Sequence, residues 1–240
     1  MSNVWWVLRR ELGVYLRSPM GFVIIAVALA VDGLLFNAFA LPGQQRSAQV
    51  LEQFFFYTSG VSIIASVFVA MRLIAEERQT GTLVLLATSP IRDWQIVLGK
   101  FLGGLGVLVL LNLLTLYMPA LVMVHGKISV GHLFAGYLGL VLISSASLSL
   151  GLLCSALAPN QLVAVILGGA LVVVFVLLWA LSRIASPPVE DLLAYLSIHD
   201  KHFRPFMRGL VSVQDVVFYV SLVYVALTMA TRVLETRRWR

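Results

Sequence analysis

The sequence is poor in charged residues and in cysteine. Only 12% of its 240 residues are Asp, Glu, Lys or Arg, whereas 60% are hydrophobic, and the mean hydropathy is +0.96. A water-soluble domain of this length needs a charged surface that this composition does not supply. Cys154 is the only cysteine, which excludes an intramolecular disulfide and any metal site built on several cysteines.

A phosphate-binding loop is also missing. Such a loop needs Gly-x-x-x-x-Gly-Lys-Ser/Thr, so that its backbone amides can cradle the phosphates of a nucleotide. Here Gly99-Lys100 is followed by Phe101, and Trp94 stands where the first glycine belongs. We therefore expect no ATPase site in this chain.

Motifs of membrane-embedded enzymes are absent as well. The sequence has no His-Glu-x-x-His, no Gly-x-Ser-x-Gly and no His-x-x-x-His within an apolar segment, although Glu76-Glu77 is an adjacent acidic pair. His199, Asp200 and His202 do not match the spacing of a strong metal site. We expect a protein that is not an enzyme, with no metal site and no cofactor bound by this chain.

Long apolar segments are what the sequence has in abundance. A membrane-spanning helix needs about 20 apolar residues, and the sequence offers six such runs within one transmembrane domain that covers residues 1–240. The fold class expected is an all-α membrane protein. The predicted spans are 20–41, 54–74, 98–124, 133–157, 162–181 and 211–231.

The segment 3–18 precedes the first span and has a different pattern. Its apolar residues recur at helical spacing and its charged residues fall between them, which predicts an amphipathic helix in the membrane interface. Ser18-Pro19 ends this helix. The predicted apolar face comprises Val4, Trp5, Leu8, Leu12, Tyr15 and Leu16, and the predicted polar face comprises Arg9, Arg10, Glu11 and Arg17.

The basic residues predict the orientation. The net charge is +6, but the Lys and Arg residues lie near the ends of the predicted spans, so the charge reflects the positive-inside rule and not nucleic-acid binding. Six spans place both termini on one side, which carries most of these residues and is therefore expected to be cytoplasmic. The opposite side carries Arg46, Lys127, Arg183, Lys201, Arg204 and Arg208.

Two connections are too long to be simple turns: the cytoplasmic segment 75–97 and the outer segment 182–210. In the first, charged residues lead to a Gly-Thr break and then to a short apolar piece, 83–87, that cannot span a membrane. An apolar piece outside the bilayer must pack against its own chain or against a partner. Gly81 allows a tight turn, and Leu83 and Leu86 are candidate apolar anchors.

These residues resemble a known family. The sequence Glu-Glu-Arg-x-x-Gly-Thr-Leu at 76–83, followed by Pro90 and by Val-Leu-Gly-Lys at 97–100, is similar to the signature of ABC type-2 exporter permeases. Val84 departs from the glutamate that many members carry there. The C-terminal sequence, with His-Phe-Arg-Pro-Phe at 202–206, resembles the subgroup of gliding-motility and copper-enzyme-maturation permeases.

The resemblance implies a permease subunit in a bacterial cytoplasmic (inner) membrane. Segment 75–97 would hold a coupling helix that docks into a separate ATPase subunit, present in two copies, which binds ATP and Mg²⁺. A second permease copy or a related permease would complete the exporter. The outer segment would form a pair of short re-entrant helices, which an extracytoplasmic partner could contact. A non-transporting scaffold of a motility or assembly complex is the alternative. The implied coupling residues are Glu76, Glu77, Arg78, Gly81, Thr82, Leu83 and Leu86.

Within the predicted spans, two further groups are of interest. Asp32 is the one acid well inside a span, and Asn37 follows on the same helix; they could line a pathway, pair with a neighbouring chain or serve a structural role. Small residues are expected to let helices approach closely, since lipid provides no hydrophobic drive between helices; a polar substrate path is the other interpretation. These small residues are Gly99, Gly103, Ser147, Gly151 and Ser155.

Overall fold

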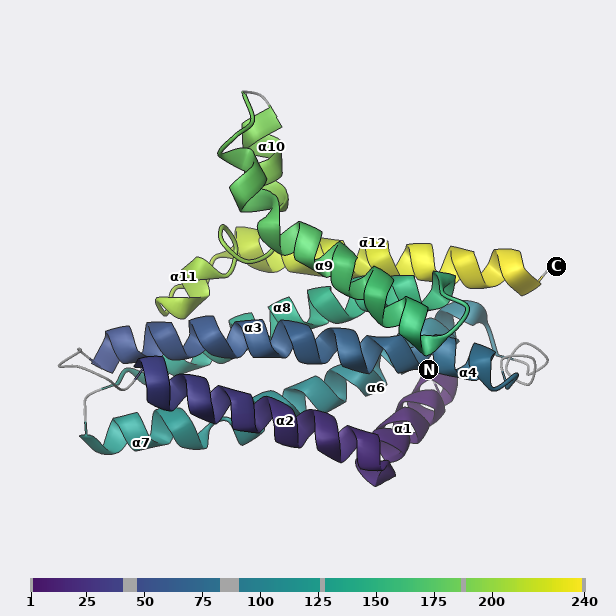
Figure 1. The fold of residues 1–240 in the computed structure, drawn as a ribbon, viewed down its shortest axis with the longest axis horizontal. Helices are drawn as coiled ribbons and strands as arrows, with labels where there is room; N and C mark the ends of the chain where they lie inside the picture. Colours follow the sequence, from purple (N-terminus) through teal and green to yellow (C-terminus); the bar gives the residue numbers. More distant parts are fainter. Residues whose placement is uncertain (1, 41–46, 83–90, 126–127, 187–188, 239–240) are drawn as a thin grey trace.

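The computed structural model describes residues 2–40, 47–82, 91–125, 128–186 and 189–238. These residues form helices joined by short connections, and six of the described helical segments are long and apolar enough to cross a membrane. Figure 1 shows a bundle along the long axis of the molecule, with the N-terminus, the C-terminus and α4 at one end. The all-helical membrane fold expected from the sequence is confirmed.

The helix bounds follow the apolar runs closely at most positions. The predicted 20–41 run corresponds to α2 (Pro19–Leu35) and a π-helical turn, η1 (Phe36–Ala40). The run 133–157 lies within α8 (Val130–Leu157), and the run 162–181 lies within α9 (Gln161–Ser182). The run 211–231 lies close to α12 (Val213–Arg238). The run 54–74 belongs to a longer helix, α3 (Ser47–Leu73). The first two turns of α3 contain polar residues, so a prediction based on hydropathy placed the start of this helix too late.

The predicted span 98–124 is divided. α6 (Asp93–Leu114) ends at Thr115, and α7 (Tyr117–His125) continues after a turn. Pro119 has no N–H to donate to the carbonyl four residues earlier, that of Thr115, so an unbroken helix would lose this hydrogen bond. The Thr115 carbonyl instead accepts from the Met118 N–H at 3.0 Å, and the Thr115 hydroxyl donates to the Asn112 carbonyl at 2.8 Å. The predicted span 98–124 thus lies within one candidate membrane span, Asp93–Val124, that contains a turn near Thr115.

α3 and α8 form the centre of the bundle. They pack against each other, and α6, α9 and α12 pack around α8. Most residues of α8 between Ala135 and Ala156 are buried, and many are Gly, Ala or Ser. Small side chains let helix backbones approach closely, which favours association where lipid gives no hydrophobic drive.

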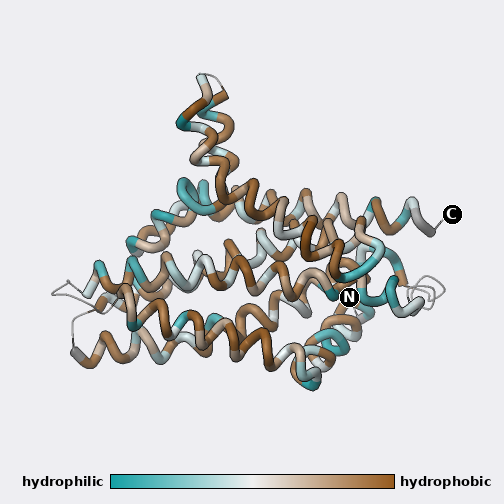
Figure 2. Tube along the Cα trace, viewed as in Figure 1, coloured by the Kyte–Doolittle hydropathy of each residue, from teal (hydrophilic) through white to brown (hydrophobic). Residues whose placement is uncertain are grey.

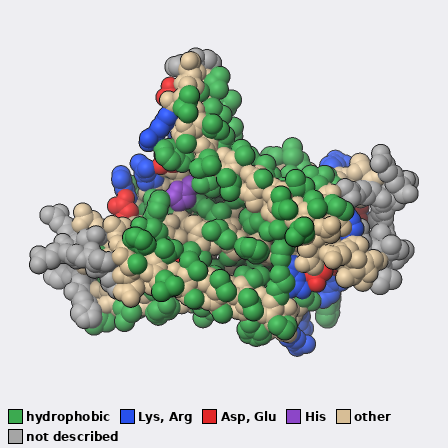
Figure 3. Space-filling view, in the orientation of Figure 1, with side chains coloured by type: hydrophobic (Ala, Val, Ile, Leu, Met, Phe, Trp, Pro, Cys, Tyr) green, Lys and Arg blue, Asp and Glu red, His purple; other side chains and the backbone are tan. Residues whose placement is uncertain are grey.

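The peripheral helices α2, α9 and α12 expose apolar side chains on their outer faces. Figure 2 shows hydrophobic colouring along most of the bundle, and Figure 3 shows hydrophobic side chains across the middle of the visible face, with charged side chains toward the two ends. An exposed apolar belt between polar ends is typical of a surface that faces lipid. The chain is thus a multi-pass membrane protein.

The N-terminal helix, α1 (Ser2–Arg17), lies at an angle to the bundle and packs on α6. The face that packs on the bundle holds Val7, Glu11 and Tyr15, which are buried, whereas Trp5 and Leu16 of the predicted apolar face are exposed. The contact with α6 is close, since a Cβ at Gly99 would come within 2.7 Å of Val7. Packing on α6 therefore buries Glu11 of the predicted polar face, and the position of the exposed apolar residues in the membrane interface stays a prediction.

The outer segment holds two short helices, α10 (Val189–Leu196) and α11 (Arg204–Met207). α10 contacts α9 and projects away from the long axis of the bundle, whereas α11 packs on α8 and α3. Because the structure includes no membrane, re-entry of this segment into the bilayer stays a prediction.

Candidate functional site at the α4 end of the bundle

A break in the helix precedes α4 (Ala75–Gln79), which follows α3 after Ile74. Ser155 of α8 supports this break. Its hydroxyl oxygen accepts hydrogen bonds from the backbone N–H groups of Ile74 at 3.2 Å and Ala75 at 3.0 Å, and the hydroxyl donates to the carbonyl of Met71 at 3.2 Å. A serine hydroxyl has one proton and two lone pairs, so all of its hydrogen-bonding capacity is used here.

A buried charge network joins α4 to α1 and α6. The ammonium of Lys100 lies 2.9 Å from Glu11 Oε1 and 2.9 Å from Glu77 Oε1, and the Lys100 side chain is only 2% exposed. Arg10 contacts the same two carboxylates, at 2.9 Å and 2.6 Å. The two cations and the two anions neutralise each other, and this pairing offsets the free-energy cost of burying the charges.

Sequence reasoning missed three members of this network. Lys100 was interpreted as a positive-inside residue, and Glu11 and Arg10 were placed on the exposed face of α1. One signal was available, since Lys100 lies between apolar residues and next to Gly99 at the start of a span. A lysine in that setting requires a buried partner.

Arg72 connects α3 to the junction between α1 and α2. Its guanidinium forms a two-point contact with Glu76, with distances of 2.7 Å and 2.9 Å, and donates to the Ser18 hydroxyl at 3.2 Å. The Tyr15 hydroxyl donates to the Val69 carbonyl at 2.7 Å, and Arg72 lies over the Tyr15 ring. Burial raises the pKa of Tyr15, so its phenol remains a hydrogen-bond donor.

Arg78 and Gln79 join α4 to the connection between α8 and α9. Arg78 donates to the carbonyls of Ala156, at 2.8 Å, and Ala158, where α8 ends and its last carbonyls lack helical partners. The side-chain oxygen of Gln79 accepts from the backbone N–H of Gln161 at 3.4 Å, at the start of α9. Glu76, Glu77 and Arg78 thus all have partners within the chain.

The turn after α4 has the conformation that glycine favours. Gly81 has a φ of +74°, in the left-handed region. The Thr80 hydroxyl donates to the Glu76 carbonyl at 2.9 Å, and the Thr82 hydroxyl donates to the Glu77 carbonyl at 3.4 Å, so both threonines satisfy carbonyls at the end of α4. The predicted anchors Leu83 and Leu86 lie outside the described residues.

The small residues predicted to favour helix packing lie at close contacts. Gly103 faces α1, where an added Cβ would come within 2.6 Å of Glu11, and Gly151 faces α3, where it would come within 2.5 Å of Ala70. Ser147 is fully buried, and its hydroxyl has no partner among the described residues. Asp32 is buried, whereas Asn37, on η1, is exposed.

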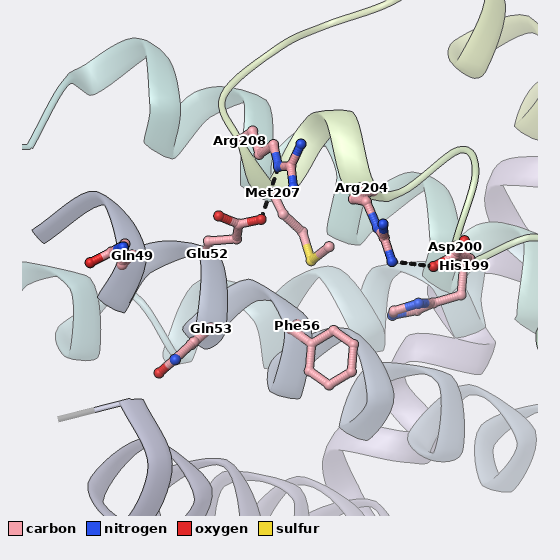
Figure 4. A pocket seen from close by; sticks show the side chains of 9 residues that line it. All are labelled: Gln49, Glu52, Gln53, Phe56, His199, Asp200, Arg204, Met207 and Arg208. Carbon is pink, nitrogen blue, oxygen red and sulfur yellow. Dashed lines mark hydrogen bonds and ion pairs between the residues drawn. The ribbon is translucent and has the colours of Figure 1, made fainter. Parts of the chain in front are cut away.

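A separate polar pocket of about 630 Å³ lies at the other end of the bundle, between the start of α3 and the segment leading to and including α11. Figure 4 shows its lining, in which Arg208 points to Glu52 and Arg204 to Asp200. The two ion-pair distances are 3.0 Å and 2.5 Å. Each charge of these pairs already has a partner.

Two histidines fix this outer segment. His199 Nε2 lies 2.9 Å from the Ser59 hydroxyl, and burial lowers the His199 pKa. His202 is buried between the Asp215 carboxylate, at 2.7 Å, and the Tyr195 carbonyl, at 2.8 Å, and it stacks on Phe218. These contacts attach the segment to α3 and α12.

Comparison with known proteins gives one positive result. A protein-family model described as "ABC-2 type transporter" matches residues 2–183, which include α1, α4, α6 and the charge network. A search of curated proteins finds no significant match.

Proposed function

The chain belongs to the ABC-2 type transporter family, and from this premise we propose that the α4 end of the bundle is where a separate ATPase subunit docks and drives the permease. The chain is a membrane permease domain, and it lacks an ATPase site of its own. ATP and Mg²⁺ would therefore bind to the partner subunit. Two ATPase subunits would act on two permease chains, either two copies of this one or this one and a relative.

The observation that carries the proposal is the charge network around Lys100. The network ties α4 to α1 and α6, Arg78 ties α4 to the end of α8, and Ser155 satisfies the backbone at the α3–α4 break. A push on the segment after α4 would reach four helices through these contacts. The charged residues at 76–78 would transmit movement, while the apolar residues Leu83 and Leu86 would contact the ATPase.

Orientation follows from the same proposal. An ATPase subunit acts from the cytoplasm, so the end that carries α4 and both termini would be cytoplasmic and the polar pocket near α11 would face outward. The excess of basic residues near the termini supports this orientation. We place the protein in a bacterial inner membrane, within the gliding-motility and copper-enzyme-maturation subgroup that its C-terminal sequence resembles. An extracytoplasmic partner would then meet the segment that holds α10 and α11.

Co-purification tests the docking proposal. The chain is co-expressed with a candidate ATPase subunit, extracted in mild detergent and captured, with the double variant Leu83→Asp plus Leu86→Asp compared with wild type. The matched control introduces the same two charges at the opposite end, as Ile184→Asp plus Val213→Asp; both side chains are largely exposed. We expect the ATPase to be captured by wild type and control but not by the first double variant.

Equal capture by both variants would refute docking through this segment. A captured ATPase whose activity responds to no substrate would favour the scaffold alternative.

A further inference from the structure

Asp32, in the last turn of α2, has a carboxyl group with no use in the coupling scheme. Its residue is 2% exposed, and its carboxylate oxygens have no hydrogen bond of good geometry among the described residues, although the Thr58 hydroxyl lies near enough to interact with them. A buried acid without a charged partner in a membrane-spanning helix is costly and most often marks a functional site.

The surroundings of Asp32 are polar. The Thr58 hydroxyl of α3 lies near the carboxyl group, and the Tyr137 phenol of α8 lies within electrostatic range of it. The phenol also lies 3.2 Å from the Thr115 hydroxyl. Asn112 accepts a hydrogen bond from Ser62 at 2.8 Å, while its amide nitrogen has no partner within the described ranges. Two helices, α3 and α8, thus place uncharged polar groups within electrostatic range of the acid.

An apolar groove of about 330 Å³ lies between α2 and α3, which run side by side in Figure 1. Its lining is entirely apolar, from Met20 to Val31 on α2 and from Val61 to Phe68 on α3. The groove follows about 16 Å of α2, at 1.5 Å per residue. It is open on one side and faces the apolar belt.

The groove and the acid lie on the same helix faces. Asp32 follows the groove residue Ala28 by four positions, and Thr58 precedes the groove residue Val61 by three, so both lie one helical turn beyond the groove. Asp32 is buried and does not itself line the groove, so a molecule lying along the groove would bring its end group to within about one helical turn of Asp32.

We propose that the groove between α2 and α3, together with Asp32, binds an amphipathic cation: an alkyl chain lies in the groove and a primary ammonium group pairs with the carboxylate. A primary ammonium has three N–H donors, which can serve the carboxylate and the neighbouring Thr58 oxygen. An anionic headgroup would be repelled, and a neutral alcohol would gain the apolar contacts but no ion pair. As a statement of substrate class, this inference rests on the proposed permease function.

Binding to the purified chain alone tests the inference, because no ATPase is needed. The chain is placed in nanodiscs of phosphatidylcholine, and the binding of radiolabelled dodecylamine is measured against empty nanodiscs, with 1-dodecanol and dodecyl sulfate as competitors. We expect dodecylamine to bind and the other two to compete poorly.

Three variants assign the site. Asp32→Asn should weaken dodecylamine binding about 10- to 100-fold, the range expected for loss of a hydrogen-bonded ion pair, and leave the weak 1-dodecanol binding unchanged. Val27→Trp, at an exposed position on the rim of the groove, should weaken both ligands. Glu190→Gln removes an exposed acid from α10 and should change neither.

Equal dodecylamine binding by wild type and Asp32→Asn would overturn the inference, as would competition by 1-dodecanol equal to that of dodecylamine. If Asp32→Asn does not fold, undiminished dodecylamine binding by Val27→Trp overturns it as well. Failure of ATPase capture in the docking experiment would leave this binding result unaffected, so the two proposals fail separately.

Discussion

Replacing Lys100 by methionine should destabilise the protein strongly. Methionine keeps the length of the side chain but removes the charge, which leaves Glu11 and Glu77 to share the half-exposed Arg10. Both carboxylates are mostly buried, with side chains 8% and 14% exposed. Breaking a buried ion pair by removing one partner costs about 3–5 kcal/mol, because the remaining charge stays buried.

A triple variant separates the charge from the packing. Lys100→Met combined with Glu11→Gln and Glu77→Gln removes the buried charges together, and Arg10 can turn to water because half of its side chain is exposed. We expect the triple variant to recover most of the lost free energy of unfolding, since replacing a whole buried ionic cluster is often close to neutral.

The free energies are measured by reversible unfolding in mixed detergent micelles. As a control, Arg232→Met removes one partner of an exposed pair with Glu235 and should change stability by no more than about 0.5 kcal/mol. The reasoning fails if Lys100→Met is as stable as wild type, or if the triple variant is no more stable than the single one.

Two further predictions concern packing and pH. Gly151→Ala should cost about 1–3 kcal/mol of unfolding free energy, because its Cβ would come within 2.5 Å of Ala70. Gly60→Ala has open space around its Cβ and should be neutral or stabilising by up to about 1 kcal/mol. Thermal unfolding of the two variants checks this, and equal losses of stability would contradict it. Burial, with a smaller contribution from Arg204, lowers the His199 pKa below its ordinary value of 6.5, against the opposing effect of Asp200. The folded protein therefore favours neutral His199, so the stabilising effect of His199 is complete above pH 6.5 and is lost as the pH falls from 6.5 toward the folded pKa. Wild type should lose more stability than His199→Gln between pH 7.5 and 5.5. Parallel pH profiles of the two proteins would rule this out.

The membrane-spanning architecture could be predicted from the sequence because the bilayer imposes a length on every apolar run. The division of 98–124 into α6 and α7 could not be predicted from hydropathy, since the residues on both sides of Thr115 are equally apolar. The backbone effect of Pro119 was the signal, and only a search for helix-breaking residues inside the span would have used it.

The burial of Glu11 on α1 could not be predicted from the periodicity of the sequence. Glu11 is buried because Lys100, 89 positions later, supplies a counter-charge, and because Gly103 leaves room for its side chain. An amphipathic pattern assigns a glutamate to the polar face by default. Two conditions far away in sequence reverse that assignment, and neither can be recognised from α1 alone.

The arrangement of the charges bears on how movement would pass through the permease. Glu77 of α4 binds cations from two helices, Arg10 of α1 and Lys100 of α6, so α4 cannot shift alone without separating buried charges. Arg72, through Ser18, adds the junction between α1 and α2 to the same assembly. Separating such pairs in a poorly hydrated site costs more than moving the helices together. Displacement of α4 by a partner should therefore move α1 and the adjoining ends of α2 and α6 as one unit, while the far end of α2, which carries Asp32, lies outside these contacts.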